Sequence, residues 1–188
     1  MNLVVLWYNI TIEKSMKYIM PSNKQPSAEN QQEKLVYWIV GFVDGEGTFS
    51  VSFNKNNTTT SGWQIFPEFV ITQGAKSLAA LEEIQKFFEC GKLYVNRRKD
   101  NHTEDLYRFC VRSFKDLEEK IAPFFQKHPL RTAKREDFNK FVQILSLMKK
   151  GIHLTPKGAN EIAKIIETMN RKKQSRYLLS SETTRQAH

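Results

Sequence analysis

The sequence predicts an α+β protein, in which helices pack against one antiparallel sheet, and three observations support this fold class. Residues 33–43 (EKLVYWIVGFV) are apolar on every side, which is typical of a buried helix. Residues 48–54 (TFSVSFN) alternate strictly between apolar and polar side chains, which is typical of a strand with one buried face. Both patterns then recur, so that the expected order is αββαββα with extra helices after it.

The first half of this order begins with the apolar helix, which we expect to end at the turn Asp44-Gly45-Glu46-Gly47. Two strands follow over residues 48–54 and 64–73, joined by a polar loop. The second strand has Ile65, Phe69 and Ile71 on one face. A helix over residues 77–89 then shows apolar side chains at helical spacing, and Cys90-Gly91 end it.

The second half repeats the pattern. We expect strands over residues 92–98 and 106–112, followed by a helix over 113–125 that Ser113 caps. Two further helices are predicted over residues 134–149 and 156–173. We assign residues 1–32 to an N-terminal extension whose part from Pro21 to Gln32 is a linker, 33–173 to the folded domain, and 174–188 to a basic C-terminal tail.

Composition limits the classes of function. The chain has 188 residues, 40% hydrophobic and 26% charged, which excludes general disorder, and no apolar run approaches the ~20 residues of a membrane span, so we expect no membrane partner. Two cysteines and four scattered histidines predict neither a disulfide scaffold nor a transition-metal site. The net charge of +9 favours a polyanionic partner, although a solvated basic surface without a ligand has the same composition.

The turn after the first helix is acidic. Asp44 and Glu46 lie at the carboxyl end of the helix, where the helix dipole disfavours negative charge by about 0.3–1 kcal/mol for each carboxylate. A divalent cation would offset this cost, and Mg²⁺ prefers carboxylate and carbonyl oxygens together with phosphate oxygens of a substrate. An ordinary surface turn has the same residue types, so the turn alone leaves both interpretations open.

The nine residues Ile39 to Gly47 (IVGFVDGEG) resemble the signature of the LAGLIDADG homing endonucleases, and the following TFSVSF is similar to the first strand of that family. The resemblance covers about residues 34–148. It implies the αββαββα homing-endonuclease fold with a saddle-shaped antiparallel sheet, here with extra C-terminal helices. It also implies hydrolysis of both strands of a long, nearly palindromic DNA site.

The resemblance implies roles for individual residues. Glu46, with the carbonyl of Gly45, would bind the catalytic metal, and Asp44 would orient the turn. Gln73, in the Thr-Gln pair at the end of the second strand, would position the attacking water. Lys134 would be the basic residue of the active site, with Arg131 or Arg135 as alternatives. The metal would be Mg²⁺, or Mn²⁺, with Ca²⁺ supporting DNA binding only.

Strand alternation predicts a DNA-reading face without reference to the family. Hydroxyl, amide and guanidinium groups at alternate positions of a sheet reach the edges of bases in the major groove. A merely solvated sheet face would show the same alternation. The residues that we expect to contact DNA are Ser50, Ser52, Asn54, Gln64, Glu68, Tyr94, Asn96, Arg98, Arg108 and Arg112.

A single motif in the chain predicts a homodimer. The first helix is too apolar to be covered by its own sheet alone, and a second copy of the same helix would cover the remainder. Gly41 leaves room for the close approach of another backbone. The expected interface residues are Leu35, Trp38, Ile39, Gly41 and Phe42.

Two functions remain open at this point. The first is a metal-dependent endonuclease that cleaves double-stranded DNA, and genes of this kind often lie in mitochondrial or chloroplast introns, which predicts an organellar location. The second is an intron RNA maturase, or another nucleic-acid-binding protein of the same fold that does not cut. Glu46 favours catalysis, because a protein that only binds phosphates has no need of a carboxylate beside them.

Overall fold

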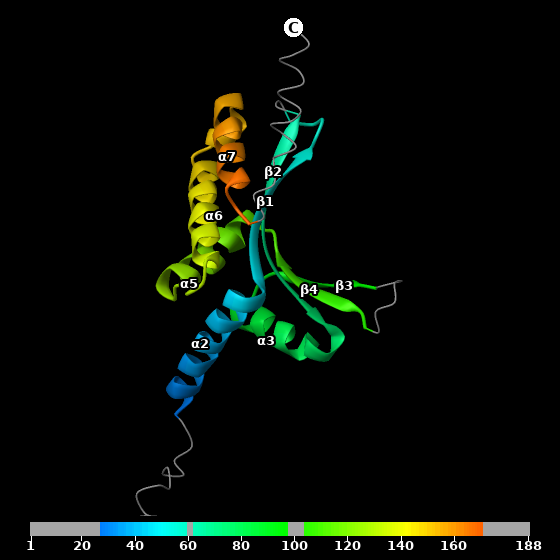
Figure 1. Ribbon diagram of the computed structural model, residues 1–188, viewed down its shortest axis with the longest axis vertical. Helices are drawn as coiled ribbons and strands as arrows, with labels where there is room; N and C mark the ends of the chain where they lie inside the picture. Colours follow the sequence, from blue (N-terminus) through cyan, green and yellow to red (C-terminus); the bar gives the residue numbers. More distant parts are fainter. Residues whose placement is uncertain (1–26, 60–61, 98–103, 171–188) are drawn as a thin grey trace, which may run out of the picture. The chain divides into compact units, whose positions relative to one another are not determined.

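The computed structural model describes residues 27–59, 62–97 and 104–170, and Figure 1 shows the elements in chain order. Contacts divide the chain into two units, residues 1–35 and residues 36–188. The sheet, the helices that pack on it and the candidate site all belong to the second unit. Among the described residues, no helix is both long and apolar enough to cross a membrane.

Helix α2 (Ala28–Glu46) is longer than predicted at both ends. It begins inside the expected linker, whose last five residues are therefore helical, and it includes three of the four residues that were expected to end it. The helix ends at Glu46, and a Cβ atom on the following Gly47 would lie 2.6 Å from Val43 Cγ1 and 2.8 Å from the Val43 carbonyl oxygen. Glycine therefore allows the chain to pass directly from the helix into the first strand.

The four predicted strands are confirmed and form one antiparallel sheet in the order β1-β2-β4-β3. The two pairings made by β2 align Phe49 with Phe69 and Phe69 with Val111. Strand β3 ends at Asn96, and the predicted end at Arg98 lies outside the described residues. The bounds are β1 (Gly47–Lys55), β2 (Trp63–Gly74), β3 (Lys92–Asn96) and β4 (Leu106–Val111).

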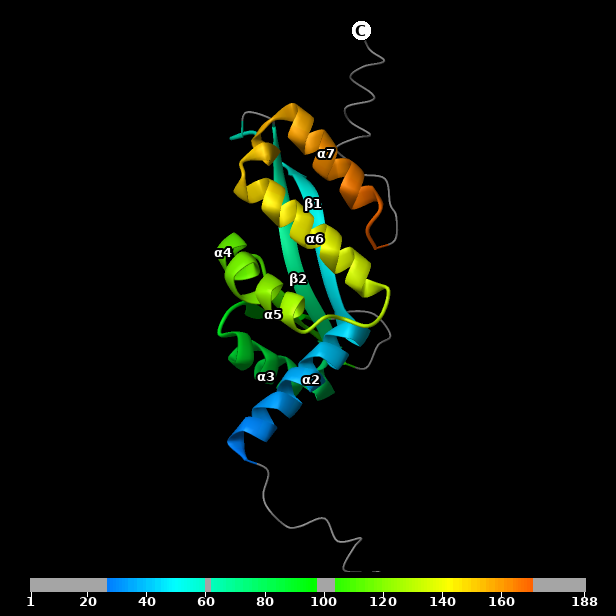
Figure 2. The ribbon, with the colours of Figure 1, turned by 90° about the vertical axis from the view of Figure 1, so that its left-hand side faces the viewer.

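One face of the sheet carries the core. Phe49, Phe69 and Phe109 occupy inward positions on three neighbouring strands, and each is fully buried. The rings of Phe49 and Phe69 stack with centroids 5.0 Å apart, and Phe125 meets the Phe49 ring edge-on at 5.5 Å. The helices lie on this face of the sheet (Figure 2), and none of the described helices covers the opposite face.

The helices that cover the core differ from the prediction mainly at their ends. The predicted helix over 113–125 is confirmed with Ser113 as its cap, since the Ser113 hydroxyl accepts from the Asp116 N–H at 3.3 Å, but its middle turn is a π-helix. Helix α7 ends at Glu167, before the predicted Lys173. The bounds are α3 (Leu78–Phe88), α4 (Phe114–Asp116), the π-helix η2 (Leu117–Ile121), α5 (Ala122–Lys127), α6 (Lys134–Lys149) and α7 (Pro156–Glu167), with 3₁₀ turns η1 (Ala75–Ser77) and η3 (Ile152–Leu154).

Helix α7 is tied back to the sheet by the turn that follows it. Asn170 adopts a left-handed conformation with φ of 49°. Its backbone N–H donates to Asp137 Oδ1 at 3.0 Å, and its side-chain Nδ2 donates to the carbonyl oxygen of Phe49 at 3.1 Å. The second bond satisfies a carbonyl group on β1, which is an edge strand of the sheet.

Candidate active site and nucleic-acid interface

Lys134, the first residue of α6, lies at the carboxyl end of α2 although 88 residues separate it from Glu46 in sequence. Its Nζ atom donates to the carbonyl oxygen of Val43 at 2.9 Å and to that of Gly45 at 3.1 Å. Both carbonyls belong to the last turn of α2, where helical carbonyl groups have no partner inside the helix. An ammonium group at this point also faces the negative end of the helix dipole.

The protonation of Lys134 is set by two opposing effects. Burial lowers the pKa of the ammonium group below its usual value, because a desolvated charge is unfavourable. The nearby carboxylates of Asp44, Glu46 and Asp137 oppose this shift without reversing it. The lysine thus gives up its proton more readily than a lysine in water does.

Asp44 joins the end of α2 to the start of α6. Its carboxylate accepts from the backbone N–H of Arg131 at 2.7 Å and from the hydroxyl of Thr132 at 2.6 Å. It also accepts from the backbone N–H of Thr132 at 3.1 Å. Burial raises the pKa of Asp44, but these hydrogen bonds and the charge of Lys134 outweigh burial and leave the pKa below its usual value.

These contacts correct one step of the sequence argument. The cost of two carboxylates at the end of α2 was expected to be offset by a divalent cation. Within the chain itself, the N–H groups of Arg131 and Thr132 already offset it for Asp44, and the ammonium of Lys134 lies at the same end of the helix. The sequence separation of more than 80 residues between the partners explains why the pattern of residues did not reveal them.

Glu46, the last residue of α2, is exposed beside the Gly45 carbonyl. One carboxylate and one carbonyl supply two oxygen ligands, fewer than the six that Mg²⁺ takes, so the remaining ligands would be water and phosphate oxygens. Among the described residues, no three His, Cys, Asp or Glu side chains gather to hold a metal. The residues present therefore fit a cation that is shared with a substrate.

The other predicted active-site residues lie at the same end of the sheet or next to Lys134. Gln73 is half-buried on β2, two residues beyond Ile71, which is the register partner of Gly47. Arg131 and Arg135, the alternatives to Lys134, are both exposed. Of the three basic residues, Lys134 is the one whose side chain contacts the carbonyls of the motif.

The register brings the described DNA-contact candidates onto one face of the sheet. Ser50 pairs with Glu68, Asn54 pairs with Gln64, and Tyr94 pairs with Arg108. This is the face opposite the buried phenylalanines, which alternate with these residues along each strand. Arg98 lies outside the described residues.

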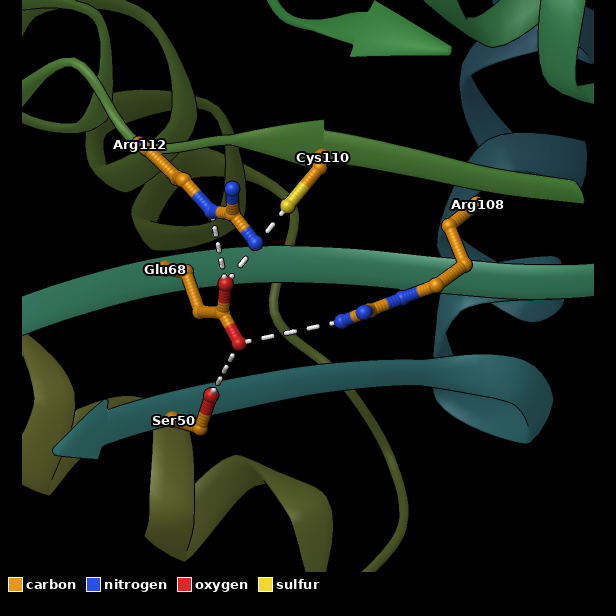
Figure 3. Close-up of polar contacts among 5 residues, drawn as sticks. All are labelled: Ser50, Glu68, Arg108, Cys110 and Arg112. Carbon is orange, nitrogen blue, oxygen red and sulfur yellow. Dashed lines mark hydrogen bonds and ion pairs between the residues drawn. The ribbon is translucent and has the colours of Figure 1, made fainter. Parts of the chain in front are cut away.

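A carboxylate occupies the middle of this face (Figure 3). Glu68 Oε2 accepts from Arg112 Nε at 3.0 Å, and Glu68 Oε1 lies 3.8 Å from an Nη atom of Arg108. The Ser50 hydroxyl donates to Oε1 at 3.5 Å, and the Cys110 thiol donates to Oε2 at 3.6 Å. Burial and the neighbouring carboxylate raise the pKa of Cys110, so the thiol keeps its proton.

The same face contains residues that the sequence prediction omitted. These residues are Thr48, Thr72 and Lys92. Each lies at an outward position of its strand, so the alternation of the sequence could have identified it. Val70 and Cys110 are register partners on this face, and both are buried. The buried pairing with Cys110 explains why an apolar residue, Val70, occurs on a face that is otherwise polar.

The exposed side of α2 differs in part from the predicted interface. Tyr37, which was not predicted, is 64% exposed, and Trp38 is 38% exposed with its ring 5.3 Å from that of Phe42. A Cβ atom on Gly41 would meet no atom of this chain within 4 Å. The assignment of Ile39 is wrong, because its side chain is fully buried in the core of its own chain and is unavailable to a second copy.

An antiparallel sheet with helices on one face and a polar, arginine-bearing surface on the other is typical of α+β proteins that present a sheet to nucleic acid. Glu46 and the half-buried Lys134 lie where α2 ends and β1 begins, and a carboxylate beside a lysine is typical of catalytic sites. The chain belongs to the LAGLIDADG endonuclease family, whose profile matches residues 39–145. This confirms the resemblance of the motif over residues 39–47.

Two solved structures and one curated protein illustrate the relationship. The homing endonuclease I-TnaI is 40% identical, with a TM-score of 0.70 over 79% of this chain and 96% of that one. I-SmaMI, bound to an uncleaved DNA target in the presence of calcium ions, is 31% identical, with a TM-score of 0.70 over 79% of this chain and 48% of that one. The predicted homing-endonuclease fold is thereby confirmed.

The curated relative is a probable intron-encoded endonuclease of Neurospora crassa, 33% identical over 135 residues. The match covers 71% of this chain and 26% of that protein. The chain thus spans about a quarter of the length of this curated relative.

Proposed function

We propose that this chain is a site-specific DNA endonuclease that hydrolyses both strands of a long, nearly palindromic duplex. The observation that carries the proposal is the position of Lys134 and Glu46 together at the end of α2, directly before β1 leads into the polar face of the sheet. The two residues that would act on phosphate therefore lie next to the surface that would bind the DNA. Membership of the LAGLIDADG endonuclease family supports the same activity.

Glu46 and the Gly45 carbonyl would hold a divalent cation, with Mg²⁺ as the physiological ion and Mn²⁺ as a substitute. Such an ion, when bound, supplies a more acidic water and withdraws charge from the phosphate oxygens. Glu46 is well placed for this role because it is exposed at the end of a helix that the rest of the chain fixes. The calcium ions in the related I-SmaMI complex support a site for divalent cations.

Lys134 would serve the leaving side of the reaction. An ammonium group has three donors, and the carbonyls of Val43 and Gly45 take two of them. The third donor would contact the scissile phosphate or the departing oxygen. The lowered pKa of Lys134 suits proton transfer, because a catalytic acid works best when its pKa is closer to the working pH.

The outward face of the sheet would read the DNA. A ribbon of antiparallel strands fits the major groove, where side chains at alternate positions reach the edges of the bases. We retain as contact residues Ser50, Ser52, Asn54, Gln64, Tyr94, Asn96, Arg98, Arg108 and Arg112. Gln73 would orient the attacking water at the end of β2 nearest the motif.

A homodimer would place one copy of the site on each DNA strand. The exposed side of α2, with Tyr37, Trp38 and Gly41, is the surface for this contact, flanked by Phe42. Leu35, earlier on the same helix, stays a prediction. The chain matches 48% of the I-SmaMI chain, which is consistent with two copies of this chain doing the work of one longer protein. The relative named as intron-encoded supports an origin in an organellar intron.

The proposal is tested by incubating the protein with a library of randomised duplex DNA in Mg²⁺ and sequencing the cut ends. We expect one recurrent, nearly palindromic site cut on both strands, and no cutting in a chelator. Intact DNA in Mg²⁺, combined with splicing of an intron RNA, would instead identify a maturase. Binding to DNA without cutting in any divalent metal would identify a binding protein of the same fold.

A further inference from the structure

Glu68 is an unusual residue for a DNA-facing surface, because a carboxylate there repels phosphate. The sequence alone predicts it as a contact residue, since the alternation of β2 points it outward. Each of its two carboxylate oxygens, however, already has two partners within the protein. Oε1 has Ser50 and Arg108 as partners, and Oε2 has Cys110 and Arg112.

The carboxylate of Glu68 is less exposed to solvent than the two arginine side chains beside it. The Glu68 side chain is 23% exposed, whereas those of Arg108 and Arg112 are 39% and 42% exposed. A carboxylate has about four lone-pair directions, and here three hydrogen bonds and the ion pair with Arg108 lie around the two oxygens. Glu68 is therefore poorly placed to accept from a base, while the guanidinium groups above it stay accessible.

The contact with Arg112 uses one particular donor. Glu68 accepts from Nε, so the outer edge of the guanidinium, where each of its two Nη groups presents one N–H, remains for another acceptor. The guanidinium carbon also lies 5.5 Å from the centre of the Tyr94 ring, which holds the group from a second side. An Nη pair presented in this way matches the O6 and N7 acceptors of guanine.

We propose that Glu68 is a positioning residue for sequence recognition, which holds Arg112, and more loosely Arg108, in the orientation that reads base edges instead of phosphates. This rests on the proposed DNA-binding function of the sheet. An arginine without such a partner turns toward the phosphates, which are always present and carry no sequence information. Glu68 thus lowers non-specific affinity and raises discrimination between sequences.

Two variants of Glu68 distinguish the effect of its charge from the effect of its side-chain length. Glu68→Gln removes the charge, whereas Glu68→Asp keeps the charge but withdraws the carboxylate by one methylene from Arg112. The matched control is Glu82→Gln, the same change of charge at an exposed site on α3, which belongs to the helix layer. Binding is measured in Ca²⁺ to the cleavage site, to its single-base variants and to random duplex.

Positioning predicts that both Glu68 variants lose discrimination, by about 5- to 150-fold at the base that Arg112 reads. With Glu68→Gln we also expect tighter binding to random duplex and a salt dependence steeper by about 0.9, as for one more neutralised phosphate. Because Glu68→Asp keeps the negative charge, its affinity for random duplex and its salt dependence should rise less than those of Glu68→Gln. Wild-type discrimination in Glu68→Asp would overturn the proposal and leave only a charge effect.

A measurement without DNA distinguishes this inference from the proposed function. In the free protein, the Nε–H signal of Arg112 in a nitrogen–proton NMR spectrum should exchange slowly with water, and faster in both Glu68 variants. Equal exchange in the wild type and the variants would overturn the proposal whatever the DNA results are. If the wild type shows no preference for any sequence, the proposed function is wrong, and the Arg112 signal alone decides whether Glu68 holds the arginine.

Discussion

Lys134 Nζ lies 3.1 Å from the carbonyl oxygen of Gly45, so the basic residue of the candidate site is bound to the same peptide group that would help to hold a metal. The carbonyl oxygen has two lone pairs, and one remains for a cation. Lysine and cation would then share an anchor, and a change at Lys134 would alter both the geometry of the helix end and the chemistry at the phosphate.

We expect Lys134→Met to reduce the cleavage rate by about 10²- to 10⁴-fold, the usual contribution of a positioned acid or base, while DNA affinity changes little. Methionine has a similar length but neither charge nor donors. Arg135→Met is the matched control, because it removes one positive charge at the neighbouring, exposed residue. Single-turnover cleavage of a labelled duplex measures the rate, and an equal loss in both variants would contradict the assignment to Lys134.

Asp44 should stabilise the folded chain in a pH-dependent way. Its pKa is lower in the folded state than in the unfolded state, so the stabilisation is fully present above the usual pKa of 3.8 and is lost as the pH falls through the lower, folded value. Asp44→Asn removes this contribution. We expect the Tm of the variant to lie below that of the wild type at pH 7, with a difference that shrinks as the pH falls below 3.8 and through the lower pKa of the folded state.

Thermal unfolding by circular dichroism at several pH values measures this difference. Asp116→Asn is a control that removes another carboxylate from a region remote in sequence from the motif. A gap for Asp44→Asn that stays constant down to acidic pH would show that the carboxylate charge is not what stabilises the contact with Thr132.

Gly41 allows two substitutions that test the isolated chain and the dimer separately. Glycine inside a helix costs about 0.5–1 kcal/mol relative to alanine, and a Cβ atom at Gly41 meets nothing within 4 Å in this chain. Gly41→Ala should therefore stabilise an isolated chain. In a dimer built on this side of α2, Gly41→Leu should overpack the interface and weaken association by about 1–3 kcal/mol.

Sedimentation over a range of concentrations measures the association. We expect the dimer dissociation constant to rise by about 5- to 150-fold in Gly41→Leu. If the wild type sediments as a monomer while it is bound to cleaved duplex, the proposed homodimer is wrong. Association unchanged in Gly41→Leu would move the interface to another surface.

Local pattern was sufficient to predict the fold. Strict alternation in β1, and apolar residues on one face of β2, identified both strands within one residue at each end. The same alternation predicted which residues share the outward face. It could not predict that Glu68 is held by Arg112, because the pairing of β2 with β4 depends on register and on the rotamers of long side chains.

The site was predictable only in part. The motif and a basic residue near position 134 followed from resemblance to the family, but the contacts between them did not. Thr132 had no signal in the sequence, and its hydroxyl contact with Asp44 appears only when α6 meets the end of α2. Ile39 was misassigned because an apolar helix gives no indication of which side its own sheet covers.

Glu46→Gln tests the metal site most directly. Glutamine keeps the shape and volume of the side chain but removes the charge that would bind a divalent cation. Cleavage in Mg²⁺ should therefore fall by orders of magnitude, because the cation supplies the activated water. DNA affinity should stay similar or rise, since a carboxylate near phosphate is neutralised.

Changing the ion separates binding from cutting in the same experiment. Ca²⁺ is larger and more flexibly coordinated than Mg²⁺, so it should support binding of the wild type to its site with little cleavage. Glu46→Gln should then bind equally well in Ca²⁺ and in chelator, because its affinity no longer depends on a bound ion. A gel with the wild type and the variant, each in Mg²⁺, Ca²⁺ and chelator, measures both quantities. Full cleavage by Glu46→Gln in Mg²⁺ would show that another residue holds the ion.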